Sequence, residues 1–169
     1  VNATRQYTTV VLVSIRDGVL SVLRDWVREG DPGTTLDDIR TQARLIAGSS
    51  VLAYAPRNHW RLYDTIGLQP AARHIHLQLA QGGELAEGRE TLRRMCRTES
   101  KNQPCLQVAV EARWTLNAFL GGYARSVTSG KPVVGEADEG VYKVLMEGLE
   151  AFAAINSSSY GETSEDEPT

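Results

Sequence analysis

The sequence has little cysteine. Cys96 and Cys105 are its only two cysteines among 169 residues, and they form no CxxC motif. This excludes a disulfide framework and is typical of free thiols in a reducing cytoplasm, which we expect to be buried. Long apolar runs are also missing: no stretch approaches the roughly 20 residues of a membrane span, and no signal-peptide pattern is present. These absences favour a globular domain of the cytoplasm.

Several catalytic and nucleotide-binding motifs are absent as well. The sequence contains no Walker A, GxGxxG, GxSxG or HExxH pattern. No motif therefore indicates a phosphate-binding loop, a dinucleotide site, a serine hydrolase or a zinc protease. Aromatic residues make up 7% of the chain and are scattered. That argues against a platform on which nucleic-acid bases stack.

Acidic charge is concentrated at the C-terminus. Residues 156–169, NSSSYGETSEDEPT, carry four acidic residues and no basic one, whereas the rest of the chain has 18 basic and 17 acidic residues. A segment rich in serine, threonine and acid offers little apolar surface to bury. We therefore predict one domain over residues 1–155 and a disordered acidic tail over 156–169. The neutral body neither favours nor excludes a nucleic-acid partner.

The first half of the chain has strong strand and turn signals. Two β-rich runs, YTTVVLVSI and VLSVLRDWV, flank Asp17-Gly18, which predicts an antiparallel hairpin over 7–27. The next segment, 35–47, has helical periodicity, with Thr35 and Asp38 at the spacing of a capping box and Gly48 at its end. Residues 51–55 then read as a strand ended by Pro56. We expect this strand to be parallel and to lie beside the hairpin.

The second half alternates extended and helical patterns. RHIHLQL at 73–79 predicts a strand and 82–100 a polar helix. The segment 104–123 holds a further helix, ended by Gly121-Gly122. The last helix spans about 139–155. This order is compatible with an RNase H-like α/β fold, a mixed sheet with helices on both faces. In that fold a first strand bearing an acidic residue precedes the hairpin, and here it would lie at or before Val1.

The last helix carries the principal candidate site. Its periodicity places Val141, Tyr142, Leu145, Leu149 and Phe152 on one face, with Lys143, Glu147 and Glu150 opposite. Glu147 fits either a solvated helix face or a ligand of Mg²⁺ or Mn²⁺, since hard cations require oxygen ligands and two-metal nucleases gather carboxylates from separate elements. Asp138 and Glu139 at the helix start fit either further metal ligands or stabilisation of the helix dipole.

Two other clusters have both functional and structural interpretations. His74 and His76 point to one side of a strand, as half of a zinc site or as an ordinary polar strand face. Arg89, Arg93 and Arg97 recur every four residues, and Arg94 and Lys101 add to them. That stripe could bind DNA phosphates. Glutamates at 84, 87, 90 and 99 equally permit a salt-bridged solvent face.

The segment GYARSVTSGKPVVGEADEGVYKVLMEGLEAF resembles the C-terminal end of the nuclease domain of tailed-phage terminase large subunits. Tyr142 and Leu149 match that family's last helix, and Glu147 stands at its metal-binding aspartate. Upstream, VLAYAPRNHWRLYDTIGLQP is similar to the family's strand, proline and following helix. The sequence departs from the family at Val144, which replaces a histidine. It also departs at Tyr54 or its alanine neighbours, Ala53 and Ala55, which occupy the place of a second acidic ligand.

The resemblance implies an RNase H-like endonuclease, a hydrolase that uses Mg²⁺ or Mn²⁺ to cleave viral DNA during packaging in the host cytoplasm. Of the site residues, the resemblance itself points to Glu147 as a catalytic metal ligand. In this reading Asp138 and Glu139 at the helix start would be the further metal ligands, with Asp138 also catalytic. The basic stripe of Arg89, Arg93, Arg97 and Lys101 would bind DNA. The implied partners are double-stranded DNA, a terminase ATPase domain, the small terminase subunit and the portal. The alternative is a catalytically degenerate RNase H-like module that docks proteins or DNA.

Overall fold

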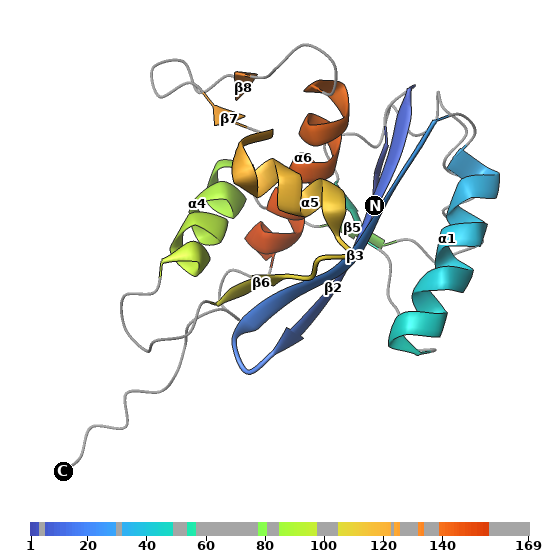
Figure 1. Ribbon diagram of the computed structural model, residues 1–169, viewed down its shortest axis with the longest axis horizontal. Coiled ribbons are helices and arrows are strands. Elements are labelled where there is room, and N and C mark those ends of the chain that lie inside the picture. The colour runs from blue at the N-terminus through green and yellow to red at the C-terminus, as the bar shows by residue number, and fades with distance from the viewer. Residues whose placement is uncertain are drawn as a thin grey trace.

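The fold was examined in a computed structural model, which describes residues 1–3, 6–29, 32–48, 54–56, 78–80, 85–97, 105–122, 124–125, 132–133 and 139–155. Figure 1 shows these segments as ribbons. Several predictions fall outside the described residues: the tail at 156–169, most of the strand at 73–79, Asp138 and Lys101. None of the described helices is long and apolar enough to cross a membrane.

The predicted hairpin is confirmed. Strands β2 (Tyr7–Arg16) and β3 (Val19–Glu29) pair antiparallel through their whole length. Asp17 and Gly18 between them have φ angles of 51° and 73°. Both are left-handed conformations, which the tight turns of right-twisted hairpins require and which Asp-Gly accepts at low cost. A register shift between Leu12 and Val13 adds a local irregularity to the ladder.

The hairpin forms the centre of a mixed four-stranded sheet. Strand β1 (Asn2–Ala3) pairs antiparallel with β2, and β6 (Leu106–Val108) pairs parallel with β3. The sheet order is β1-β2-β3-β6. Strand β6 lies in the first part of the segment 104–123, for which only a helix was predicted, so this strand was missed. Hydrogen bonds from Leu20 N to Cys105 O and from Ala109 N to Val22 O, both 2.8 Å long, fix it to β3.

A second pair of strands corrects another prediction. Strand β4 (Tyr54–Pro56) pairs parallel with β5 (Gln78–Ala80), and within the described residues this pair is separate from the four-stranded sheet. The expectation that 51–55 lies beside the hairpin is therefore wrong for its described part. A strand of three residues that ends in a proline, which has no N–H to donate, gives little indication of its pairing partner. Strands β7 (Ala124–Arg125) and β8 (Pro132–Val133) form an antiparallel pair.

Helix α1 (Pro32–Ala47) covers one face of the sheet. Its Ile39 and Ala43 pack with Leu12 and Trp26 of the hairpin, and Trp26 Nε1 donates a hydrogen bond of 2.9 Å to Gln42 Oε1. The helix begins at Pro32, a residue favoured at the first helical position. The predicted capping box is therefore wrong, because Thr35 lies inside the helix. Gly48, with φ of 80°, ends the helix as predicted.

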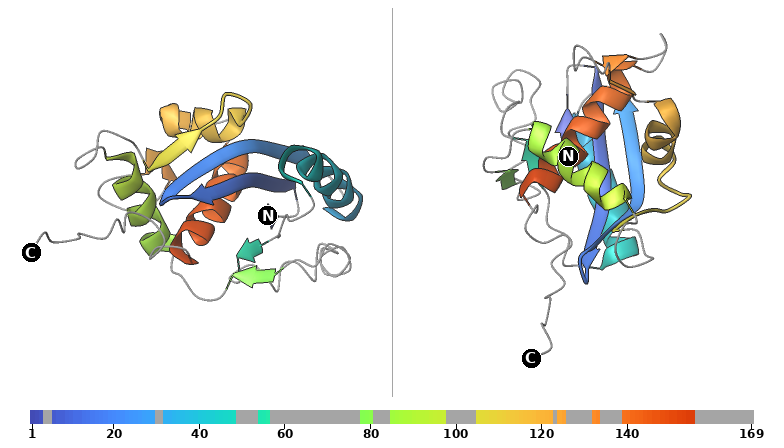
Figure 2. Two further views of the ribbon diagram at one scale, coloured as in Figure 1. Left: turned by 90° about the horizontal axis from the view of Figure 1, so that it is seen from below. Right: turned by 90° about the vertical axis from the view of Figure 1, so that its left-hand side faces the viewer.

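The other face of the sheet is covered by α6 (Glu139–Ile155), as Figures 1 and 2 show. Helix α4 (Leu85–Cys96) packs on α6, and the short helix α5 (Arg113–Asn117) continues into a π turn, Ala118–Gly122. The main core cluster includes Leu20, Val22, Leu92, Met95, Leu145 and Leu149. With helices on both faces of a mixed sheet, the predicted α/β class is confirmed, while the RNase H topology is seen only in part.

Helix α6 is buried on nearly every side. Between residues 141 and 154, Lys143 is the only exposed residue. Glu147 and Glu150 retain 9% and 1% of their accessible surface. Of the two interpretations of Glu147, the role of a metal ligand stays a prediction, and the solvated helix face is therefore wrong. The reason is that α6 has a layer on each side: the sheet covers one side, and α4 covers another. A residue opposite the sheet therefore still contacts protein.

Candidate functional site

Strand β1 meets α6 at Asn2. The Asn2 side chain is 1% exposed, and its Nδ2 donates a hydrogen bond of 2.8 Å to the carbonyl oxygen of Val144. The Asn2 carbonyl accepts a 3.1 Å bond from Thr9 Oγ1. Gly148 permits the close approach, because a Cβ added there would lie 3.1 Å from the Asn2 Cβ. The first strand therefore presents an amide to α6. The RNase H-like expectation put a strand with an acidic residue at or before Val1, whereas the strand that precedes the hairpin is β1 at Asn2–Ala3, and neither of its residues is acidic.

Glu147 lies in the same turn of α6, between Val144 and Gly148. Strand β4 also packs beside α6, and Figure 2 shows β4 on the same side of the helix as the N-terminus. The fold thus brings together β1, β4 and α6, three elements from distant parts of the sequence. Glu147, of which 9% is exposed, thus belongs to the turn of α6 whose backbone contacts the first strand.

The side chains near Glu147 can be compared with those that a divalent metal ion requires. Among the described residues, no three His, Cys, Asp or Glu side chains lie close enough to hold a metal ion. Glu147 and the Asn2 amide offer oxygen atoms of the kind that Mg²⁺ and Mn²⁺ bind. Asp138 is outside the described residues, and of Glu139 only the backbone is described. The predicted roles of Glu147, Asp138 and Glu139 as metal ligands stay predictions.

A second site is a groove between α4, α6 and the π turn. It has a volume of about 360 Å³ and is lined by Arg89, Leu92, Arg93, Cys96, Arg97, Ala118, Phe119, Met146 and Glu150. The structure thus brings three of the four predicted DNA-binding residues to one groove. The fourth, Lys101, lies outside the described residues.

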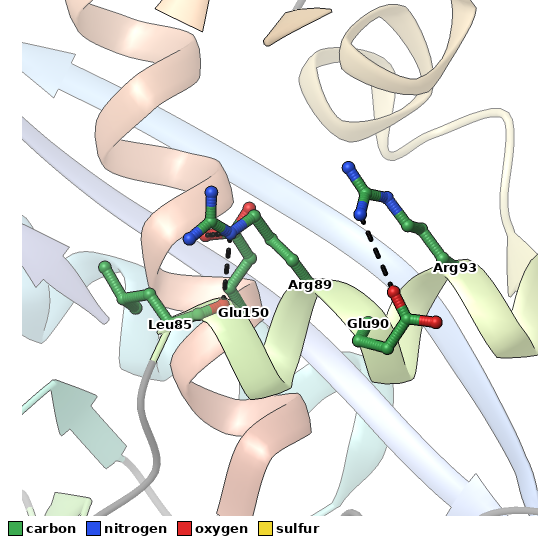
Figure 3. Close-up of polar contacts among 5 residues, drawn as sticks. All are labelled: Leu85, Arg89, Glu90, Arg93 and Glu150. Carbon is green, nitrogen blue, oxygen red and sulfur yellow. Dashed lines mark hydrogen bonds and ion pairs between the residues drawn. The ribbon is translucent and has the colours of Figure 1, made fainter. Parts of the chain in front are cut away.

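Arg89 connects the groove to the buried side of α6. Its Nε lies 3.9 Å from Glu150 Oε2 and 3.3 Å from the carbonyl oxygen of Leu85, as Figure 3 shows. Arg93 Nη1 lies 3.6 Å from Glu90 Oε2, with both side chains more than half exposed. An exposed pair of this kind contributes about 0–1 kcal/mol, so Arg93 remains available to other anions.

The sequence pattern did not identify Glu150 as part of this groove. Its neighbour in space is Gly88, where an added Cβ would lie 1.8 Å from the Glu150 carbonyl oxygen. Helices α4 and α6 therefore approach so closely that only glycine fits. The available signal was this glycine within an otherwise polar helical run, since glycine in a helix interior is unfavourable unless packing requires it.

Cys96 stands at the end of α4 and lines the groove. It is exposed, and Cys105 is half-buried, so the prediction of buried thiols is wrong for Cys96. Although the residue is exposed, the groove wall partly desolvates its sulfur and raises the pKa of the Cys96 thiol above its ordinary value of 9.0. At neutral pH the groove therefore holds a neutral thiol, with Arg89, Arg93 and Arg97 supplying its positive charge.

Comparison with known proteins gave a likeness of fold. No protein-family model and no curated protein sequence matches the chain. The large terminase from a thermophilic bacteriophage, in complex with ADP, superposes with a TM-score of 0.56 at 12% identity. Its complex with ATP-gamma-S gives a TM-score of 0.55 at 12% identity, and another crystal structure of it gives 0.55 at 11%.

In each case the match covers 94% of this chain and 38% of the terminase chain. The chain therefore spans less than half the length of the protein it resembles. At this level of identity the likeness concerns the fold, and the activity needs separate evidence. The chain has a mixed α/β fold similar to part of a bacteriophage large terminase.

Proposed function

We propose that this chain is the nuclease-type, RNase H-like domain of a phage DNA-packaging terminase large subunit. The observation that carries the proposal is the structural similarity to a large terminase over 94% of the chain. Two further features support it: the terminase-like pattern of α6, with Tyr142, Glu147 and Leu149, and the packing of β1 and β4 against α6, the helix that carries Glu147. The partners would be double-stranded DNA, an ATPase domain, a small terminase subunit and a portal.

In this proposal Glu147, with Asp138 or Glu139, holds Mg²⁺ or Mn²⁺. The bound metal would supply activation of water for phosphodiester hydrolysis. The chain's own contribution is to position the Glu147 carboxylate in a largely water-excluded turn of α6. Arg89, Arg93, Arg97 and Lys101 would contact DNA phosphates, since guanidinium groups bind phosphate oxygens through paired hydrogen bonds.

A second candidate is a module of the same fold that docks DNA or protein without cleaving DNA. The observation that favours it is Asn2. The buried polar side chain of β1 is an amide that donates to Val144 O, whereas a two-metal site gathers carboxylates from several elements. A site with Glu147 as its principal carboxylate would hold a metal weakly and cleave DNA slowly.

Metal-dependent stabilisation and plasmid nicking separate the two candidates. We expect Mn²⁺ to raise the melting temperature of the chain and to support nicking, and Glu147→Gln to abolish both effects. Gln is preferred to Ala because Glu147 is buried, and Ala would leave a cavity. Glu111→Gln, the same change at an exposed position, is the control. Binding of DNA without stabilisation by Mn²⁺ or nicking would favour the docking module.

A further inference from the structure

We propose that the groove between α4, α6 and the π turn binds the chain's own acidic C-terminal segment, residues 156–169. The groove has the charge of a receptor for an acidic peptide, and this segment is the most acidic part of the sequence. The proposal is independent of the nuclease assignment. If that assignment is also correct, the segment competes with DNA for the same arginines.

The groove has a net positive charge. Three arginines and one glutamate line it, and the glutamate, Glu150, lies beside Arg89. Arg93 and Arg97 are exposed at the rim. Arg93 forms an exposed ion pair with Glu90, and the carboxylate in such a pair is readily exchanged for another carboxylate. A segment with several carboxylates would therefore gain charge-assisted hydrogen bonds at this rim.

The floor of the groove is apolar. Leu92, Ala118 and Met146 are buried there, and Phe119 is 37% exposed. The phosphate backbone of a DNA duplex would use the rim, whereas a peptide can also place a side chain on the floor. The C-terminal segment matches this combination: Tyr160 precedes Glu162, Glu165, Asp166 and Glu167, and no residue of the segment is basic.

The segment is long enough to reach every arginine of the groove. It follows α6, whose Glu150 lines the groove and lies about 7.5 Å from the helix end at a rise of 1.5 Å per residue. From Arg89 to Arg97 is about 12 Å along α4 by the same rise. The 14 residues of the segment can extend about 45 Å. Because the segment is tethered, its effective concentration near the groove is in the millimolar range, so weak contacts suffice.

Cys96 provides a direct test, because it lines the groove and is exposed. The rate of its alkylation by the neutral reagent iodoacetamide would be measured by peptide mass spectrometry in the intact chain and in a chain that ends at residue 155. We expect alkylation of Cys96 to be about threefold or more faster without the segment, while Cys105 serves as an internal control. Salt at 0.5 M should speed the reaction of the intact chain, because it screens charge pairs.

A synthetic peptide of residues 156–169 would confirm the contact in trans. Added to the shortened chain, it should restore protection of Cys96, and a peptide with its four carboxylates changed to amides should not. Arg93→Gln should weaken protection by the peptide, and Arg16→Gln, exposed at the hairpin end, should have no effect. Equal Cys96 rates in the intact and shortened chains would overturn the proposal. The readout uses neither DNA nor metal, so it does not depend on the nuclease assignment.

Discussion

The side chain of Asn2 donates a hydrogen bond to the carbonyl oxygen of Val144, 142 residues further along the chain. This bond joins the first strand to the last helix, one turn before Gly148, and both partners are buried. An amide can make it because Nδ2 is a donor, and a carboxylate at the same position has no donor to offer. The contact therefore stabilises the fold in the absence of a metal.

The first prediction is that Asn2→Asp tests whether a side chain at position 2 can help Glu147 to bind a metal ion. Without metal, the variant should be less stable by about 2–4 kcal/mol, because it loses the bond to Val144 O and buries a charged carboxylate. With millimolar Mn²⁺, the variant should recover stability more than the parent chain does, since a second carboxylate would complete a pair of metal ligands. Thermal unfolding with and without Mn²⁺ measures both effects.

Asn2→Ala is the matched control for this prediction. It loses the same hydrogen bond and should be destabilised, but Mn²⁺ should give it no extra recovery. If Mn²⁺ stabilises the Asp and Ala variants equally, the turn around Glu147 is not a metal-binding position.

The second prediction concerns the close contact between α4 and α6 at Gly88. An added Cβ at Gly88 would lie 1.8 Å from the carbonyl oxygen of Glu150, so Gly88→Ala must push the helices apart and should cost about 1–3 kcal/mol or more. Gly140→Ala is the control, because a Cβ added at Gly140 would lie 3.4 Å from the nearest atom of the Tyr7 ring, an ordinary contact distance. There Ala should be neutral or stabilising by up to about 1 kcal/mol, since it favours the helix. Urea unfolding of the two variants measures the difference.

The hairpin and the last helix were predictable because local chemistry determines them. Asp17-Gly18 adopts the turn that its residues favour, and the apolar periodicity of 139–155 is strong. Strand β6 was missed because its three residues, Leu106 to Val108, stand in an apolar run next to a helix. Nothing in that run marks its pairing with β3, which depends on contacts with residues far away in sequence.

The candidate site was predictable in its residues but not in their surroundings. Helical periodicity placed Glu147 and Glu150 opposite the apolar face, and it could not show that a second layer covers that side. Whether a polar helix face meets water or another element depends on tertiary packing. Arg89, Arg93 and Arg97, which recur every four residues in the sequence, line one groove, and their role in binding DNA stays a prediction. The ion pair between Arg89 and Glu150 could not be predicted, because it depends on how α4 packs against α6.

The attachment of α5 to the sheet gives a third prediction. Helix α5 begins after Ala112, which has no side chain that could cap it. Asp25 of β3 supplies the missing acceptor, and its Oδ2 accepts a hydrogen bond of 2.6 Å from Thr115 N. Asp25→Ala should cost about 1–3 kcal/mol, because it leaves a buried donor without this acceptor. Asp25→Asn keeps an acceptor oxygen and should cost less. Equal losses of unfolding free energy in the two variants would show that the carboxylate charge, rather than the hydrogen bond, matters.

The thiol of Cys96 gives a prediction about pH. Desolvation by the groove wall raises its pKa above the ordinary value of 9.0, so the thiolate, the form that reacts with alkylating reagents, appears only at higher pH than in an unfolded chain. The rate of alkylation should therefore rise with a midpoint above that of the same thiol measured in urea. Phe119→Ala opens the groove, restores water around the sulfur and should lower the midpoint toward the unfolded value. Arg16→Gln, distant on the hairpin, should leave the midpoint unchanged. A midpoint in the folded chain at or below that in urea would mean that the charge of Arg93 and Arg97 outweighs the loss of water.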